Sequence, residues 1–336
     1  MSLLKVNELT KIFKTFKRRE GLTGAVKDLF YRNYEPLIAV DHICFNVDEG
    51  EVIGFIGPNG AGKSTTIKML TGILKSTAGE MQVLGFDPFK QRTAYTKHIG
   101  VVFGQRTQLW WDIAVIESLK LLGAVYGVPK DTFNQTLELL IDILDLKQIL
   151  HTPVRKLSLG QRIRSDLAAA LIHSPKILFL DEPTIGLDAV VKVKVRNFLR
   201  EINKRFKTTM ILTTHDLYEI EELCRRIIII DKGNIIYDGE LNSIKTLPGL
   251  ARSITVDFFG EIEIDKLTSL VGEGVNVKQI ESSRAELSYI RRNTPTAELM
   301  KIIVENFKIA DLELHDPNIE DIVMKIYRDG IQGQYE

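Results

Sequence analysis

The chain has 336 residues, which is enough for one large domain and a smaller second one. Lys+Arg and Asp+Glu both number 44, so the net charge is zero and gives no indication of a nucleic acid or anionic membrane partner. The two cysteines, Cys44 and Cys224, lack metal-ligand spacing and suit a reducing compartment. No secretion signal and no apolar run of about 18 residues is found, so we expect a protein that does not cross a membrane by itself.

The N-terminal part of the chain predicts two strands separated by an insertion. Residues 4–9 and 40–47 alternate between apolar and polar, as half-buried strands do. The basic and aromatic stretch 10–19 contains Phe13, which either stacks on a nucleotide base or packs on the protein core. Residues 21–36 carry apolar side chains at helical spacing, and this segment docks either on a partner or on its own domain.

A glycine-rich stretch after the second strand fits the phosphate-binding pattern G-x-x-x-x-G-K-[ST]. A buried strand is predicted at 51–56 and a helix from 66 onward, which is the context that this motif requires. The glycines let backbone N–H groups turn toward an anion, the helix N-terminus adds positive charge, Lys63 reaches the outer phosphates, and the Ser64 hydroxyl can ligate Mg²⁺. The predicted nucleotide-binding residues here are Gly57, Pro58, Asn59, Gly60, Ala61, Gly62, Lys63, Ser64, Thr65 and Thr66.

Three further strands are each followed by polar residues. The strand at 99–104 precedes Gln105, that at 176–180 precedes Asp181 and Glu182, and that at 209–214 precedes His215. The carboxyl ends of parallel strands meet at one edge of a sheet, where α/β proteins bind ligands. Asp181 can hold Mg²⁺, Glu182 can polarise a water molecule for attack on the γ-phosphate, and Gln105 can reach either the metal or that water.

A helical region interrupts the strands. Residues 113–149 contain two apolar stripes separated by a Gly-Val-Pro break, and Asp131 is a candidate N-cap of the second helix. Ser158 predicts the N-cap of a long alanine-rich helix, which would give a second helix N-terminus able to face an anion. Both tryptophans, Trp110 and Trp111, lie just before this region and serve either as an anchor for a partner or as core residues.

The ordered set of these motifs resembles the ATP-binding cassette (ABC) ATPase family over residues 1 to about 245. By this resemblance Asp181 is the Walker B acid, Glu182 the catalytic base, Gln105 the Q-loop glutamine and His215 the switch histidine, while Phe13 stacks on adenine. The signature motif, usually Leu-Ser-Gly-Gly-Gln, is present as Leu157, Ser158, Leu159, Gly160 and Gln161, with a leucine in place of the first glycine.

The resemblance implies an α/β fold of the phosphate-loop NTPase class. The ABC domain, 1–245, would contain an antiparallel β subdomain and a helical subdomain at about 106–172. A small α+β domain, 246–336, would follow it. In that domain the sequence predicts strands at 253–258, 285–290 and 309–314 and helices at 296–307 and 319–328.

The resemblance also implies the function. ATP would bind with Mg²⁺ at Lys63 and Ser64, and a second copy or a related ATPase subunit would contribute its Ser158, Gly160 and Gln161. The tail pattern at 315–322 resembles ATPases of ABC-2 type exporters, whose permeases are separate membrane chains. We therefore expect a cytoplasmic protein on the inner face of the cell membrane that binds no nucleic acid. The alternatives are a soluble ABC ATPase acting on ribosomes or DNA, and a phosphate-loop kinase, against which residues 158–161 and His215 argue.

Overall fold

The computed structural model describes residues 2–16, 34–104, 106–214, 216–244, 250–290, 294–317 and 319–329. The chain forms two compact units, which divide between Gly239 and Glu240, shortly before the boundary predicted at residue 245. Two predicted site residues lie outside the described residues, namely Gln105 and His215. Residues 21–33 of the predicted amphipathic segment 21–36 also lie outside them.

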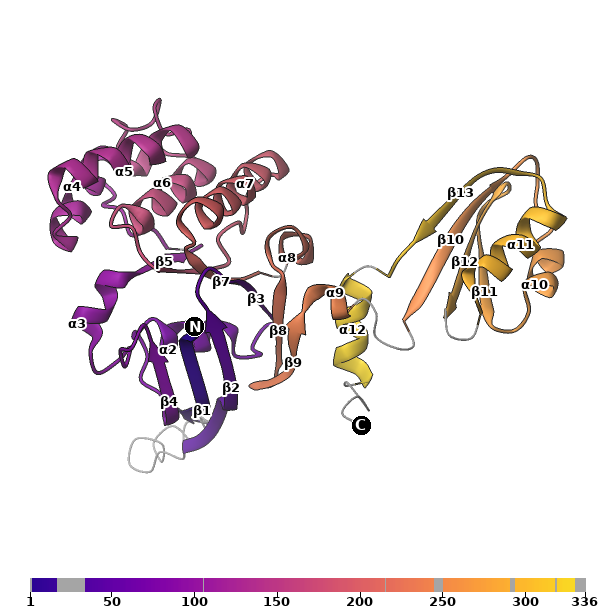
Figure 1. The fold of residues 1–336 in the computed structure, drawn as a ribbon, viewed down its shortest axis with the longest axis horizontal. Coiled ribbons are helices and arrows are strands. Elements are labelled where there is room, and N and C mark those ends of the chain that lie inside the picture. The colour runs from indigo at the N-terminus through magenta and orange to yellow at the C-terminus, as the bar shows by residue number, and fades with distance from the viewer. Residues whose placement is uncertain are drawn as a thin grey trace, which may run out of the picture. The chain divides into compact units, whose positions relative to one another are not determined.

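The first unit contains a six-stranded sheet in the order β5-β6-β7-β3-β8-β9, in which β5, β6, β7, β3 and β8 run parallel (Figure 1). The parallel strands are largely apolar, as residues 227–230 are, because a parallel sheet covered on both faces buries most of its side chains. The carboxyl ends of the parallel strands therefore meet at one edge, as the sequence predicts. The strands are β3 (Val52–Ile56), β5 (Ile99–Phe103), β6 (Ile177–Asp181), β7 (Thr209–Thr213), β8 (Arg226–Asp231) and β9 (Asn234–Glu240).

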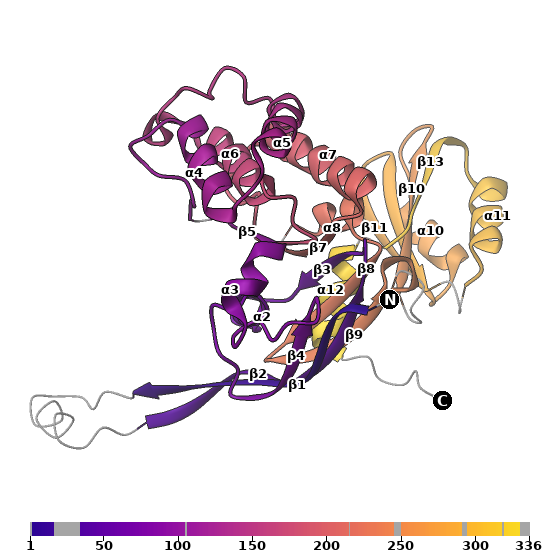
Figure 2. The same cartoon turned by 60° about the vertical axis from the view of Figure 1, so that its left-hand side comes forward.

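An antiparallel sheet of β1 (Ser2–Phe16), β2 (Tyr34–Asp48) and β4 (Ala78–Val83) packs on the parallel sheet through a shared core. The first strand does not stop near Leu9 but continues through the basic stretch to Phe16, paired with β2 along its whole length. The pairing shifts register at several points, and the backbones of Glu8 and His42 take left-handed conformations there. The β1–β2 ribbon extends well beyond the rest of the sheet (Figure 2).

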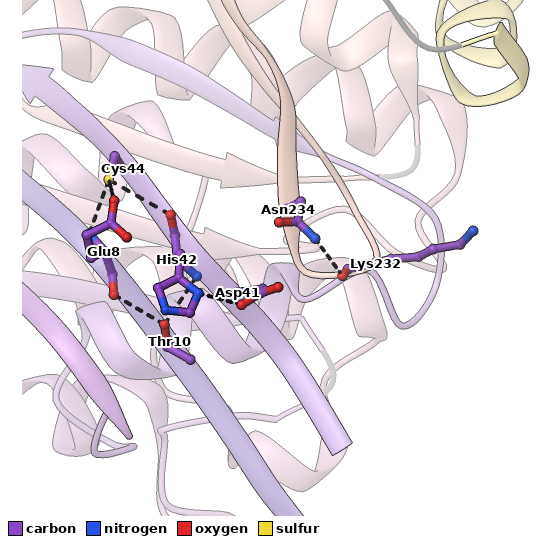
Figure 3. A network of polar contacts seen from close by, with 7 residues as sticks. All are labelled: Glu8, Thr10, Asp41, His42, Cys44, Lys232 and Asn234. Atoms are coloured by element: carbon purple, nitrogen blue, oxygen red, sulfur yellow. Dashed lines mark hydrogen bonds and ion pairs between the residues drawn. The ribbon is translucent and has the colours of Figure 1, made fainter. Parts of the chain in front are cut away.

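The second strand also supports the glycine-rich loop. The backbone N–H of Asp41 donates to the carbonyl of Gly233 at 2.9 Å, and the N–H of Gly233 donates to the carbonyl of Ala61 at 2.9 Å. Figure 3 shows Asp41 and His42 of β2 beside the Lys232–Asn234 turn that joins β8 to β9. The loop is therefore fixed by backbone hydrogen bonds before any ligand binds.

The helices of the first unit include the predicted helical subdomain. Pro129 occupies the N-cap position of helix α5, so the prediction that Asp131 caps this helix is wrong. Asp131 lies in the first turn instead, where the helix dipole favours an acidic side chain. At α6 the predicted cap is correct, because the Ser158 hydroxyl accepts from the backbone N–H of Gln161 and the Gln161 side chain accepts from the backbone N–H of Ser158. The helices are α2 (Lys63–Leu70), α3 (Arg92–Tyr95), α4 (Val115–Tyr126), α5 (Lys130–Ile143), α6 (Leu159–Leu171), α7 (Ala189–Phe206) and α8 (Leu217–Leu223), with 3₁₀ turns η1 (Thr96–His98) and η2 (Val154–Lys156).

The second unit is an antiparallel sheet in the order β11-β12-β10-β13 with a β-α-β-β-α-β chain order. Its α10 and β11 are additional to the elements that the sequence predicted; β11 has only Val275 and Val277 as inward apolar residues, too short a pattern to stand out. No helix in the described ranges is long and apolar enough to span a bilayer. The elements are α9 (Leu241–Ile244), β10 (Ala251–Phe258), α10 (Ile264–Val271), β11 (Val275–Glu281), β12 (Arg284–Ile290), α11 (Thr296–Asn306), β13 (Ile309–His315) and α12 (Ile319–Asp329).

Candidate functional site

The glycine-rich loop joins β3 to α2 and has the backbone that its glycines permit. Gly60 and Gly62 have φ of 83° and 113°, which side-chain-bearing residues rarely adopt. A Cβ on Gly57 would collide with the carbonyl of Ile230, and one on Gly62 with the carbonyl of Ala39. Thr66, in the first turn of α2, is fully buried and its hydroxyl donates to the carbonyl of Gly62 at 3.0 Å. The loop is thus a rigid cradle at a helix N-terminus.

The Lys63 ammonium lies inside this cradle. Its Nζ donates to the carbonyls of Gly57 at 2.6 Å and Pro58 at 3.1 Å, and the residue is only 7% exposed. Burial lowers the pKa of Lys63, whereas the nearby carboxylates of Glu182 and Asp181 act in the opposite direction. A partly desolvated cation whose hydrogen bonds, within the described part of the chain, go to carbonyl oxygens is well prepared to bind an anion such as a phosphate.

The carboxylate of Asp181, at the end of β6, lies beside the first turn of helix α2, which carries Lys63 and Ser64. Asp181 Oδ1, at the end of β6, accepts from the Ser64 hydroxyl at 3.1 Å and from the Thr213 hydroxyl at 2.6 Å. A hydroxyl and a carboxylate side by side form the hard oxygen donor set that Mg²⁺ prefers, so these residues fit that metal. Ser64 and Asp181 would hold it, and the ion would neutralise charge that develops on the phosphates.

Glu182 follows Asp181 and has a left-handed backbone, with φ of 52°. Its N–H donates to the carbonyl of Thr213 at 3.0 Å, with a longer contact to the Thr213 hydroxyl at 3.2 Å. A non-glycine residue in this conformation is strained, and such strain persists only where the surroundings enforce it. The bond between β6 and β7 therefore fixes the direction in which the Glu182 side chain leaves the sheet.

A cavity of about 720 Å³ opens beside these groups. Asn59, Ser64, Asp181 and Glu182 line it together with apolar groups, and the volume is adequate for a nucleotide. The complete lining is Asn59, Ser64, Lys68, Ile73, Phe103, Gly104, Arg106, Asp181, Glu182 and Ile185. The geometry brings a metal-compatible oxygen pair and the Glu182 carboxylate to one cavity, which Asn59 and Ser64 of the phosphate loop also line.

The flanks of Gln105 and His215 are well placed even though both residues lie outside the described part of the chain. On one side of Gln105, the N–H of Gly104 donates to the carbonyl of Asp181 at 2.9 Å. Beyond His215, Asp216 forms an ion pair with Lys192 of α7 at 2.6 Å. Gly104 thus contacts β6 and Asp216 contacts α7, and the positions and roles of the Gln105 and His215 side chains stay predictions.

The signature residues lie at the N-terminus of α6, packed on the turn before α7. Ser158 is exposed, and Gly160 contacts Val191. Leu159, which replaces a glycine of the usual motif, reaches over Gly186. Within the described part of the chain, Ser158, Gly160 and Gln161 do not line the 720 Å³ cavity.

Phe13 lies in β1, opposite Leu37 of β2, and is half-buried. The Lys11 ammonium lies 5.1 Å from the centroid of its ring. Phe13 is not among the residues that line the cavity, so adenine stacking by this residue stays a prediction.

Two polar residues of the site region escaped the sequence analysis. Thr213 is fully buried and holds Asp181, yet the sequence marks it only as the penultimate residue of a predicted strand. Asp166 is buried in α6 and binds Thr107 and Gln108, although it stands in an alanine-rich helix without any motif. An acidic residue on the apolar stripe of a helix was the available signal for Asp166.

Known structures share the fold. One solved structure, described as the ATP binding subunit of an ABC transporter, aligns with a TM-score of 0.60 and 24% sequence identity. The alignment covers 72% of this chain and 92% of the chain in that structure. The cbiO1 protein of Clostridium perfringens, part of an ABC transporter complex, covers 72% of this chain and 90% of its own at a TM-score of 0.58 and 27% identity. The α/β fold of ABC ATPase cassettes is thereby confirmed.

Sequence comparison agrees with the fold. The ABC transporter family matches residues 40–185. The ABC transporter ATP-binding protein NatA of Bacillus subtilis is 34% identical over 206 residues, 61% of this chain and 83% of NatA. The Nod factor export ATP-binding protein I of Ralstonia nicotianae is 32% identical over 298 residues, 88% of this chain and 91% of that protein. The chain therefore belongs to the ABC transporter ATP-binding proteins and is an ATPase that couples ATP hydrolysis to transport.

Proposed function

We propose that this chain is the ATP-hydrolysing subunit of an ABC-2 type exporter, and that it drives permease subunits carried on separate membrane chains. The names of two relatives support export or transport of a bulky molecule: the Nod factor export protein and the bacitracin transport protein BcrA of Bacillus licheniformis, which is 28% identical over 297 residues. The relatives do not support the alternative of a soluble ATPase acting on ribosomes or DNA. The protein would then lie on the cytoplasmic face of the membrane.

The observation that carries the proposed mechanism is the separation of two anion-binding helix ends. The N-terminus of α2 faces the cavity, whereas the capped N-terminus of α6 does not line it. An exposed helix N-terminus favours a nearby anion, so Ser158 and Gly160 would close on ATP held by Lys63 of a second copy or a related subunit. ATP binding would join two subunits and hydrolysis would separate them. The permease would change conformation as its ATPase subunits alternate between these two states.

The site residues take these roles in the proposal. Lys63 and the loop at 57–66 bind the phosphates, Ser64 and Asp181 hold Mg²⁺ with Gln105, and Glu182 activates the water that attacks the γ-phosphate. His215 assists hydrolysis and Phe13 stacks on adenine. The exposed Trp110 and Trp111, 45% and 49% accessible, provide an apolar docking face for the permease.

Purification from membranes tests the exporter assignment. A tagged chain carrying Glu182→Gln, extracted in detergent with ATP, should retain a multi-spanning membrane protein in stoichiometric amount. A matched sample with Trp110→Ala and Trp111→Ala should lose that protein while its ATP affinity stays unchanged. Recovery of ribosomes or DNA instead, with no membrane chain, would refute the assignment.

A further inference from the structure

The carboxylate of Asp166 links α6 to the chain that follows Gln105. Its Oδ1 accepts from the Thr107 hydroxyl at 2.8 Å and from the backbone N–H of Gln108 at 3.0 Å. The backbone carbonyl of Asp166 accepts from the Gln108 side-chain amide at 2.9 Å. The Thr107 hydroxyl also accepts from the N–H of Leu109 at 3.2 Å, so one compact network fixes three consecutive residues.

A second contact lies one helical turn earlier. The guanidinium of Arg162 sits 5.4 Å from the centroid of the Trp111 ring. Residues four apart in a helix share a face, so Arg162 and Asp166 hold the same segment at two points. Thr107–Trp111, here called the tethered segment, is thereby attached to the helix that begins at the signature residues.

The residues just before the tethered segment are attached elsewhere. The N–H of Gly104 donates to the carbonyl of Asp181 at 2.9 Å, and a Cβ at Gly104 would collide with the carbonyl of Glu182. Arg106 is still attached to β5, because its N–H donates to the carbonyl of Phe103 at 2.9 Å. The attachment to the signature helix α6 therefore begins between Arg106 and Thr107. Any shift of α6 relative to β6 has to be taken up there.

We propose that Asp166 is a positioning residue of the ATPase cycle, which makes the tethered segment and the signature helix move as one piece. This inference rests on the site roles proposed above. A buried carboxylate is an expensive way to hold a loop, since burial raises the pKa of Asp166 to about 6. Its facing groups are Arg162 on its own helix and Thr107, Gln108 and the N–H of Leu109 on the segment. The charge strengthens the bonds that a neutral side chain would make more weakly.

The test combines Asp166→Asn and Thr107→Val, singly and together, in the full-length chain. Each single variant should lower kcat of basal ATP hydrolysis roughly tenfold, as small misplacements of catalytic groups do, while the Kd for ATP stays within about twofold. The double variant should be no slower than the slower single one, because both substitutions weaken the same link. Ser165→Ala is the control, since the hydroxyl of the buried Ser165 donates to the carbonyl of Gln161 within α6 itself.

Tryptophan emission gives a structural readout that does not depend on activity. Both tryptophans of the chain, Trp110 and Trp111, lie in the tethered segment. Acrylamide should quench them more strongly in Asp166→Asn and Thr107→Val than in wild type or Ser165→Ala. Greater quenching with unchanged kcat, additive losses in the double variant, or a loss of ATP affinity equal to the loss of kcat would each overturn the proposal. Basal hydrolysis needs no permease, so such a failure leaves the exporter assignment standing.

Discussion

The hydroxyl of Ser64 lies 3.1 Å from Oδ1 of Asp181, although 117 residues separate them in the chain. One belongs to the first turn of α2 and the other to the end of β6, and Thr213 holds the carboxylate from the neighbouring strand at 2.6 Å. The fold itself therefore places the predicted metal ligands side by side.

Glu182→Gln should preserve ATP binding and slow turnover by ~10²–10⁴-fold, because it removes the positioned base and little else. Colorimetric phosphate release gives the rate, and gel filtration with ATP should show a trapped dimer. Glu201→Gln on α7, whose carboxylate only pairs with Arg205 at the surface, is the control. Turnover close to that of wild type would remove Glu182 from the role of base.

Lys63→Ala should weaken nucleotide binding itself by at least tenfold. The ammonium is the buried cation of the loop, and a charge-assisted bond to phosphate would be lost. Isothermal titration with a non-hydrolysable ATP analogue measures the effect. Lys90→Ala, which removes an exposed ammonium paired with Asp87, should bind the analogue as wild type does. An unchanged Kd in Lys63→Ala would contradict the assignment of the loop.

Thr213→Val should lower kcat about 10–100-fold, the usual effect of removing a residue that orients a metal ligand. Valine keeps the volume but no longer donates to Asp181 Oδ1. Thr209→Val is a matched control at the other end of β7, where the equally buried hydroxyl accepts from the N–H of Gly50 at 2.8 Å. Raising Mg²⁺ should partly restore Thr213→Val; equal losses in both variants would indicate a purely structural effect.

Asp166→Asn should stabilise the protein near pH 7.5 by up to about 3 kcal/mol, since the pKa of Asp166 rises from 3.8 to about 6 on folding. The folded state holds the proton of Asp166 more tightly than the unfolded state does. Ionisation of Asp166 therefore lowers the free energy of unfolding as the pH rises from about 4 to 6. Urea unfolding at several pH values measures the difference between the proteins. It should be largest above pH 6 and vanish toward pH 4; a constant difference would exclude Asp166 as its source.

The sequence alone determined the phosphate loop, the order of the strands that end in polar residues, and the capped α6. Each is a local pattern: glycines at fixed spacing, apolar runs of strand length, and a serine three residues before glutamine. Local patterns were weaker for the second unit, whose short strand β11 and helix α10 were missed, and for β1, which continues beyond the predicted residues 4–9 and pairs with β2 as far as Phe16.

Only the tertiary structure decided which side chains meet. Thr213 and Asp166 have no motif, because their importance comes from a partner on another strand or segment. The left-handed backbone of Glu182 likewise depends on its bond to β7. The sequence predicts that a nucleotide binds at the loop, since a helix end and its glycines are local. The packing of β6, β7 and α6 around that loop establishes what holds the catalytic groups, since such contacts join residues far apart in the chain.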